Sequence, residues 1–112
     1  MDWILSYPEK TTRQLLRDIY DANPSGFGRA REITFVLTHI KDQDVEILLN
    51  ELHEKNWATS YLKKTPHHSS TVECLRRNYV LDNLQLQLDE KYFSMLANKY
   101  EITFDGWFTE IV

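Results

Sequence analysis

The chain has 112 residues, the size of one ordinary domain, which excludes an enzyme built from two domains. Hydrophobic residues make up 42% of the chain and charged residues 27%, so it carries enough apolar side chains for a packed core and lacks the composition of a disordered protein. Its net charge of −4 argues against a protein whose main task is to bind nucleic acid phosphates, because such domains are usually basic. We treat residues 1–112 as a single domain.

The first predicted elements are a helix over 8–22 and a strand over 31–40. Ser6 and Glu9 have the spacing of a capping box, and apolar residues then recur at helical spacing until an Asn-Pro-Ser-Gly turn. In the strand, β-branched and aromatic residues dominate, and alternate residues form two sets that face opposite sides of a sheet, as in a pleated strand.

A second helix is predicted over 43–55, and Asp42 or Asp44 can cap its amino terminus. Its apolar side chains form one stripe while its polar side chains share the other side, so we expect an acidic face that points outward. A strand over 57–62 follows.

The last part of the chain contains a hairpin partner, a helix and a final strand. A polar turn at 66–70 leads into a strand over 72–81, which we expect to pair with the preceding strand. Residues 83–88 fit either a continuation of that strand or the approach to a helix. The helix is predicted over 89–100, since two acidic residues favour its start, and the last strand over 101–104 ends at an Asp-Gly turn.

These elements give the order helix, then β-α-β-β-α-β. We therefore expect an α/β fold of the α+β type, a ferredoxin-like split β-α-β sandwich over residues 31–108 with a four-stranded antiparallel sheet. Both crossover helices are expected on one face of the sheet, and the helix over 8–22 is an extra amino-terminal element.

Histidines and one cysteine are the side chains on which catalysis or metal binding would depend. The pair His67-His68 with Cys74 is a cluster of metal-ligand types, and a hydrolase that uses it is one open alternative. The spacing matches no established zinc pattern, and Cys74 lies in a predicted strand, where a buried, inert thiol is expected. No phosphate loop, nucleophile elbow or catalytic carboxylate pair occurs. We expect no enzyme, no catalytic residues, no metal and no cofactor.

The amino terminus lacks the basic start and apolar core of a signal peptide. No stretch approaches the roughly 18 consecutive apolar residues of a membrane span, and a single cysteine cannot form an internal disulfide. We expect a cytoplasmic protein without a membrane partner.

A second alternative is an RNA-binding module built on the hairpin 55–79. Sheets of this kind can stack bases on aromatic side chains. The competing interpretation is that the aromatic rings belong to the core, and the glycine-bearing signature of the common RNA-recognition sheet is absent. The basic and aromatic residues concerned are Lys55, Lys63, Lys64, Arg76 and Arg77, with Trp57, Tyr61 and Tyr79.

The acidic segment 42–54 is the strongest surface feature, with five of the 17 acidic residues and no lysine or arginine. On a helical wheel, Ile47 lies on its outward side among polar and acidic residues. Such an apolar residue can anchor a basic partner, because the charges steer the encounter and the isoleucine is desolvated at the centre. The simpler interpretation is a solvated outer face. The candidate partner-binding residues are Asp44, Ile47, Asn50, Glu51 and Glu54.

The carboxyl end of the chain, together with the junction near residue 39, resembles the regulator of ribonuclease E activity B family. Members of that family have a helix that ends Leu-Ala-x-Lys-aromatic, a short strand and then aromatic-Asp-Gly-Trp. The matching residues here are Leu96-Ala97-Asn98-Lys99-Tyr100 and Phe104-Asp105-Gly106-Trp107, with His39-Ile40 followed by Asp44-Val45-Glu46 at the strand-to-helix junction.

The resemblance implies a non-catalytic bacterial protein that binds the endoribonuclease of the RNA-degradation machinery and restrains or redirects it. His39, Asp105, Gly106 and Trp107 are the family-motif residues. We expect Asp105-Gly106 to form a tight turn, with a positive φ at the glycine, and Trp107 to fold back as a large plug.

The leading hypothesis is therefore a regulator or inhibitor whose acidic face docks on the basic surface of a ribonuclease. Carboxylates can occupy positions where RNA phosphates would lie, so an inhibitor of a nuclease is expected to be locally acidic. The same reasoning fits an immunity protein that neutralises a nuclease toxin, and the sequence does not separate the two.

Overall fold

The computed structural model describes residues 3–5, 12–22, 24 and 28–110. A short 3-10 turn at Asp42–Asp44 precedes the second helix. The helices and strands, in chain order, are β1 (Trp3–Leu5), α1 (Thr12–Ala22), β2 (Arg31–Thr38), α2 (Val45–Glu54), β3 (Ala58–Leu62), β4 (Thr71–Tyr79), α3 (Asn83–Tyr100) and β5 (Thr103–Glu110).

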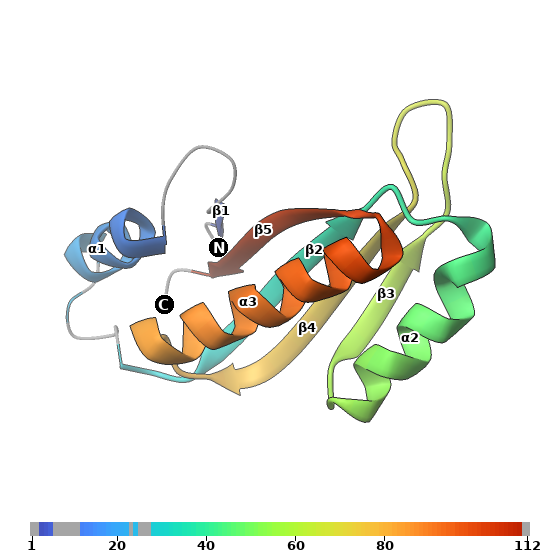
Figure 1. Ribbon diagram of the computed structural model, residues 1–112. Coiled ribbons are helices and arrows are strands. Elements are labelled where there is room, and N and C mark those ends of the chain that lie inside the picture. Colours follow the sequence, from blue (N-terminus) through green and yellow to red (C-terminus); the bar gives the residue numbers. More distant parts are fainter. Residues whose placement is uncertain (1–2, 6–11, 23, 25–27, 111–112) are drawn as a thin grey trace.

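The strands form one antiparallel sheet in the order β1-β5-β2-β4-β3. The predicted α+β class and the four-stranded antiparallel core are confirmed, and the short strand β1, which the sequence analysis did not predict, extends the sheet beyond β5. Helix α3 runs along the sheet beside β2 and β5, and α2 packs against β3 (Figure 1).

An aromatic cluster forms the centre of the core. Phe35 of β2 stacks on Phe93 of α3 with 4.6 Å between ring centroids, and Trp57 meets both rings edge-on at 5.3 and 4.9 Å. All three side chains are buried. Rings that interlock in this way fix the position of α3 on the sheet, because each ring excludes the others from alternative packings.

Helix α3 begins at Asn83, six residues before the predicted start at 89, so that prediction was wrong. The Asp82 carboxylate accepts a hydrogen bond from the backbone N–H of Leu84 at 3.1 Å and caps the helix. This resolves the open segment 83–88 as helix. The alternating leucines of this segment have the pattern of a strand. Only Leu86 is buried, however, while Leu84 and Leu88 are exposed.

The predicted turn at Asp105-Gly106 was also wrong, because strand β5 continues through it. Phe35 pairs with Trp107, and Leu37 pairs with Phe104, so β5 holds one more residue than β2 between these two pairs. The extra residue is a β-bulge, for which the predicted positive φ of Gly106 is observed at 92°. Trp107 remains in the strand and is completely buried.

The other predicted elements match the structure closely. The hairpin of β3 and β4 is confirmed, with pairs from Ala58 with Leu75 to Leu62 with Thr71. Helix α1 is described from residue 12 onward, so the first part of the predicted helix over 8–22 and its capping box lie outside the described residues.

Candidate protein-binding site

Helix α2 presents the predicted apolar residue on its outer face. Leu48 and Leu52 are completely buried against the sheet, whereas Ile47 is 59% exposed. Asn50 and Glu54, which follow at helical spacing, are also exposed. The helix is therefore amphipathic with an isoleucine on its solvent side.

Glu51, in contrast, is not a free surface carboxylate. Its Oε1 accepts a hydrogen bond from the Lys99 ammonium at 2.7 Å, and its Oε2 accepts one from the Tyr100 hydroxyl at 2.5 Å. Partial burial by itself raises the pKa of Glu51, but these two hydrogen bonds and the charge of Lys99 outweigh it and hold the pKa below 4.5. The contact ties α2 to the last turn of α3.

A hollow of about 280 Å³ lies between the two helices at this contact. Of the five predicted partner-binding residues, the structure brings four together around the hollow, and Lys99 and Tyr100 complete its lining. The four are Ile47, Asn50, Glu51 and Glu54. Asp44, the fifth, is half-buried at the amino-terminal cap of α2, where its side chain makes no capping hydrogen bond.

Lys99 and Tyr100 are the residues of this site that sequence reasoning missed. In the sequence both residues stand out only as part of the family motif that ends the helix. Their adjacency to Glu51 is a contact over 48 and 49 residues of sequence, which no helical or strand periodicity encodes.

The face keeps an acidic character after this ion pair is counted. Asp42, Glu46 and Glu54 are exposed, and none of them makes an ion pair with another described residue. Of the two carboxylates that line the hollow with Ile47, Glu54 makes no ion pair within the described chain, whereas Glu51 is paired with Lys99.

The Glu51 contact predicts an acid-sensitive contribution to stability. Because the pKa of Glu51 is lower in the folded chain, its contribution is present above about pH 4.5 and is lost as the pH falls through the folded pKa. Glu51→Gln should lower the free energy of unfolding at pH 7 by about 1 kcal/mol and flatten its decrease in acid. Urea unfolding across pH 3–7 measures this.

The matched control for that measurement is Glu101→Gln. It removes the ion pair between Lys41 and Glu101, which is 3.1 Å long and has a carboxylate 82% exposed, so the expected loss is smaller. If both variants unfold alike at every pH, Glu51 contributes no more than an ordinary surface charge.

Three of the family-motif residues form part of the β5 bulge region already described, and the fourth directly follows the carboxyl end of β2. His39 is exposed and adopts a positive φ of 62° directly after the strand. Its Nδ1 lies 3.1 Å from the Thr103 hydroxyl, which links the end of β2 to the start of β5. These residues therefore shape the sheet rather than the α2 face.

The cluster of His67, His68 and Cys74 is not brought together as a metal site. The two histidines are exposed in the loop of the hairpin, and Cys74 is buried, with a pKa raised by burial and by the charge of Glu73. Among the described residues, no group of three or more metal-ligand side chains is placed to hold an ion. The geometry agrees with the expected burial of Cys74.

The basic hairpin does not present its aromatic rings for base stacking. Trp57 and Tyr79 are buried, and Tyr61 packs against the core. The guanidinium of Arg76 already lies 3.9 Å from the centre of the Trp57 ring. Lys63 and its neighbour are exposed, but charge without stacking surfaces is a weak basis for binding single-stranded RNA.

Within the described part of the chain, none of the helices has the length and apolar character needed to cross a bilayer. These residues define a small α+β protein in which the outer face of α2 exposes an isoleucine beside acidic residues. The chain belongs to the family described as Regulator of ribonuclease activity B, whose family model matches residues 9–109, nearly the whole chain.

Family membership confirms the resemblance found in the sequence. It assigns the chain to proteins that regulate a ribonuclease, a regulatory class rather than an enzyme class. Comparisons with curated proteins and with solved structures give no match.

Proposed function

We propose that this protein restrains a ribonuclease by binding it through the outer face of α2. The family supports ribonuclease regulation through a protein contact. The observation that carries the choice of face is Ile47, which is 59% exposed and lines a hollow together with Glu54, an exposed carboxylate that makes no ion pair within the described chain.

The chemistry of the face matches a basic partner surface. Exposed Asp42, Glu46 and Glu54 attract lysine and arginine side chains and raise the rate of encounter. Ile47 and the hollow beside it then offer an apolar contact that excludes water at the centre. A ribonuclease must bind RNA phosphates with basic side chains, so a bound acidic face competes for the same groups.

The proposal places the protein in the cytoplasm, where RNA is degraded. A nuclease toxin would present the same basic chemistry, so immunity to a toxin is an alternative target for the same face. Purified ribonuclease E from the native host is the direct probe, because capture and inhibition of that enzyme select RNA regulation over immunity.

Glu54→Lys should weaken binding to this ribonuclease about tenfold at low salt, because it replaces an attractive charge with a repulsive one. The loss should shrink as salt is raised, since these charges are exposed and screened. Surface-bound ribonuclease and a titration of the variant measure the affinity, and cleavage of a fluorescent RNA measures the inhibition.

Asp21→Lys provides the matched control, because Asp21 is exposed on α1 and its replacement changes the net charge equally. Equal losses of affinity in the two variants would mean that binding depends only on the net charge of the protein. Unchanged affinity in Glu54→Lys would place the ribonuclease contact elsewhere on the protein.

A further inference from the structure

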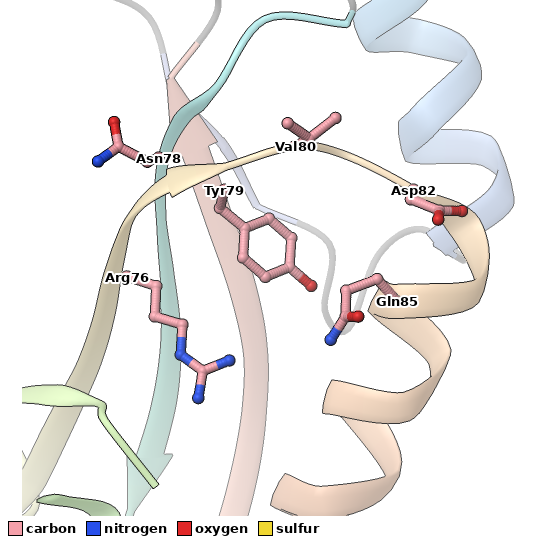
Figure 2. Close-up of a pocket in the computed structure, with 6 residues that line it drawn as sticks. All are labelled: Arg76, Asn78, Tyr79, Val80, Asp82 and Gln85. Atoms are coloured by element: carbon pink, nitrogen blue, oxygen red, sulfur yellow. The ribbon is translucent and has the colours of Figure 1, made fainter.

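Two adjoining hollows lie between β4 and the first half of α3, and Arg76 lines both. The larger, of about 480 Å³, is shown in Figure 2, where the Arg76 guanidinium and the Tyr79 hydroxyl point into the space between strand and helix. The smaller, of about 220 Å³, is lined by Lys55, Trp57, Arg76, Asp89 and Tyr92. None of these residues lines the α2 hollow.

Arg76 is held in a fixed position without an acidic partner. Its guanidinium lies over the Trp57 ring at 3.9 Å, and its Nη2 donates a hydrogen bond to the Lys55 carbonyl at 2.5 Å. It makes no ion pair within the described chain, whereas the adjacent Arg77 pairs with Glu32 at 3.5 Å. The remaining N–H groups of Arg76 are therefore available to an acceptor from outside.

A buried carboxylate with spare hydrogen-bonding capacity lies on the other wall of the smaller hollow. Asp89 is 8% exposed, and its Oδ2 accepts hydrogen bonds from the Tyr79 hydroxyl and from Gln85 Nε2, the latter at 3.1 Å. Its Oδ1 accepts none from the residues that the structure describes. That oxygen can accept from a donor in the hollow.

Tyr92 lines the same hollow, and its hydroxyl is buried without a hydrogen-bond partner among the described residues. Burial raises the pKa of Tyr92 to about 12, so the hydroxyl keeps its proton at neutral pH. Buried hydroxyls are nearly always satisfied by protein, water or ligand, so this one is available to a polar group that reaches it.

We propose that the smaller hollow binds the zwitterionic head of a free α-amino acid. The ligand carboxylate would accept hydrogen bonds from Arg76 and Lys55, and its ammonium group would donate to Asp89 Oδ1 and Tyr92 Oη. A single ligand that carries both charges can bond to the basic wall and to the acidic wall, which make no ion pair with each other within the described chain.

The size and the mixed charge of the hollow restrict the ligand. A volume of 220 Å³ equals that of about seven water molecules, which suits a small amino acid and is below the range of sites for larger metabolites. The Asp89 carboxylate disfavours a phosphate or a nucleic acid strand, because like charges repel at short distance.

The test is a titration of the full chain, labelled with ¹⁵N, with L-alanine and then with each of the other common amino acids. Saturable shifts are expected at the Trp57 indole N–H and at the backbone amides of Asp89 and Tyr92. Propionate lacks the ammonium group and ethylamine lacks the carboxylate, so each should bind at least about tenfold more weakly than L-alanine. Equal binding of propionate, or no saturable shift with any amino acid at about 10 mM, would overturn the proposal.

Two variants locate the site, and Arg77→Gln is the matched control for the first. Arg76→Gln should reduce the affinity at least about tenfold, whereas Arg77→Gln should leave it unchanged. Tyr92→Phe keeps the ring and removes only the hydroxyl, so it should weaken binding without lowering the Tm of the free protein. Wild-type affinity in Arg76→Gln, or in Tyr92→Phe if the first variant does not fold, contradicts the assignment.

Discussion

Trp107→Ala is expected to lower the free energy of unfolding by about 3–5 kcal/mol. Trp107 is completely buried in β5, where it pairs with Phe35 of the neighbouring strand. Truncation to alanine removes the apolar surface of the largest side chain and leaves a cavity that a packed sheet cannot close. Because small domains are stable by only about 5–15 kcal/mol, this change removes a large part of the total.

Urea unfolding measures this loss, with Trp107→Phe as the control that keeps an aromatic ring in the same place. The control should lose less than the alanine variant, because the residual cavity is smaller. A loss below about 1 kcal/mol for alanine, with an unchanged denaturant slope, would show that the tryptophan is not a core residue.

Ile47→Ala is expected to weaken binding to the ribonuclease about thirtyfold, the effect of an interface hot spot worth about 2 kcal/mol. The side chain is 59% exposed in the free protein, so its truncation should leave the stability of the fold almost unchanged. The loss of affinity should persist at high salt, since it arises from apolar contact rather than from charge.

Leu88→Ala is the matched control, because Leu88 is 57% exposed on α3 and is not among the residues that line the α2 hollow. Both variants remove a similar exposed apolar side chain, and only Ile47→Ala should affect capture and inhibition. If Leu88→Ala weakens binding as much as Ile47→Ala, the α3 face is part of the contact and the proposed site is wrong or incomplete.

The two predictions test different levels of the molecule. Trp107→Ala reports on the core and should reduce the amount of folded protein, whereas Ile47→Ala reports on the surface and should act on a protein that remains folded. Measuring affinity well below the Tm of each variant keeps the two effects apart.

Sequence patterns gave correct predictions for features that depend on a single helix or strand. The periodicities of β2 and α2 come from short-range spacing, and they correctly separated buried Leu48 and Leu52 from exposed Ile47. The family motif, carried by a run of neighbouring residues, identified the family that the comparison confirms.

Patterns of the same kind failed where a neighbouring element decided the outcome. The alternating leucines before residue 89 resemble a strand. Asp82 nevertheless caps α3 ahead of them, and only Leu86 among them is buried. Asp105-Gly106 has the composition of a turn, yet pairing with β2 turns it into a bulge within β5.

The sequence by itself determined the α+β class, the antiparallel hairpin and the amphipathic α2, because these follow from local propensity and from periodic burial. Only the tertiary structure decided that Glu51 is paired with Lys99 and Tyr100, and that Arg76 faces Asp89 and Tyr92 without an ion pair. Such contacts join residues far apart in the chain, and they exist only after the helices have packed on the sheet.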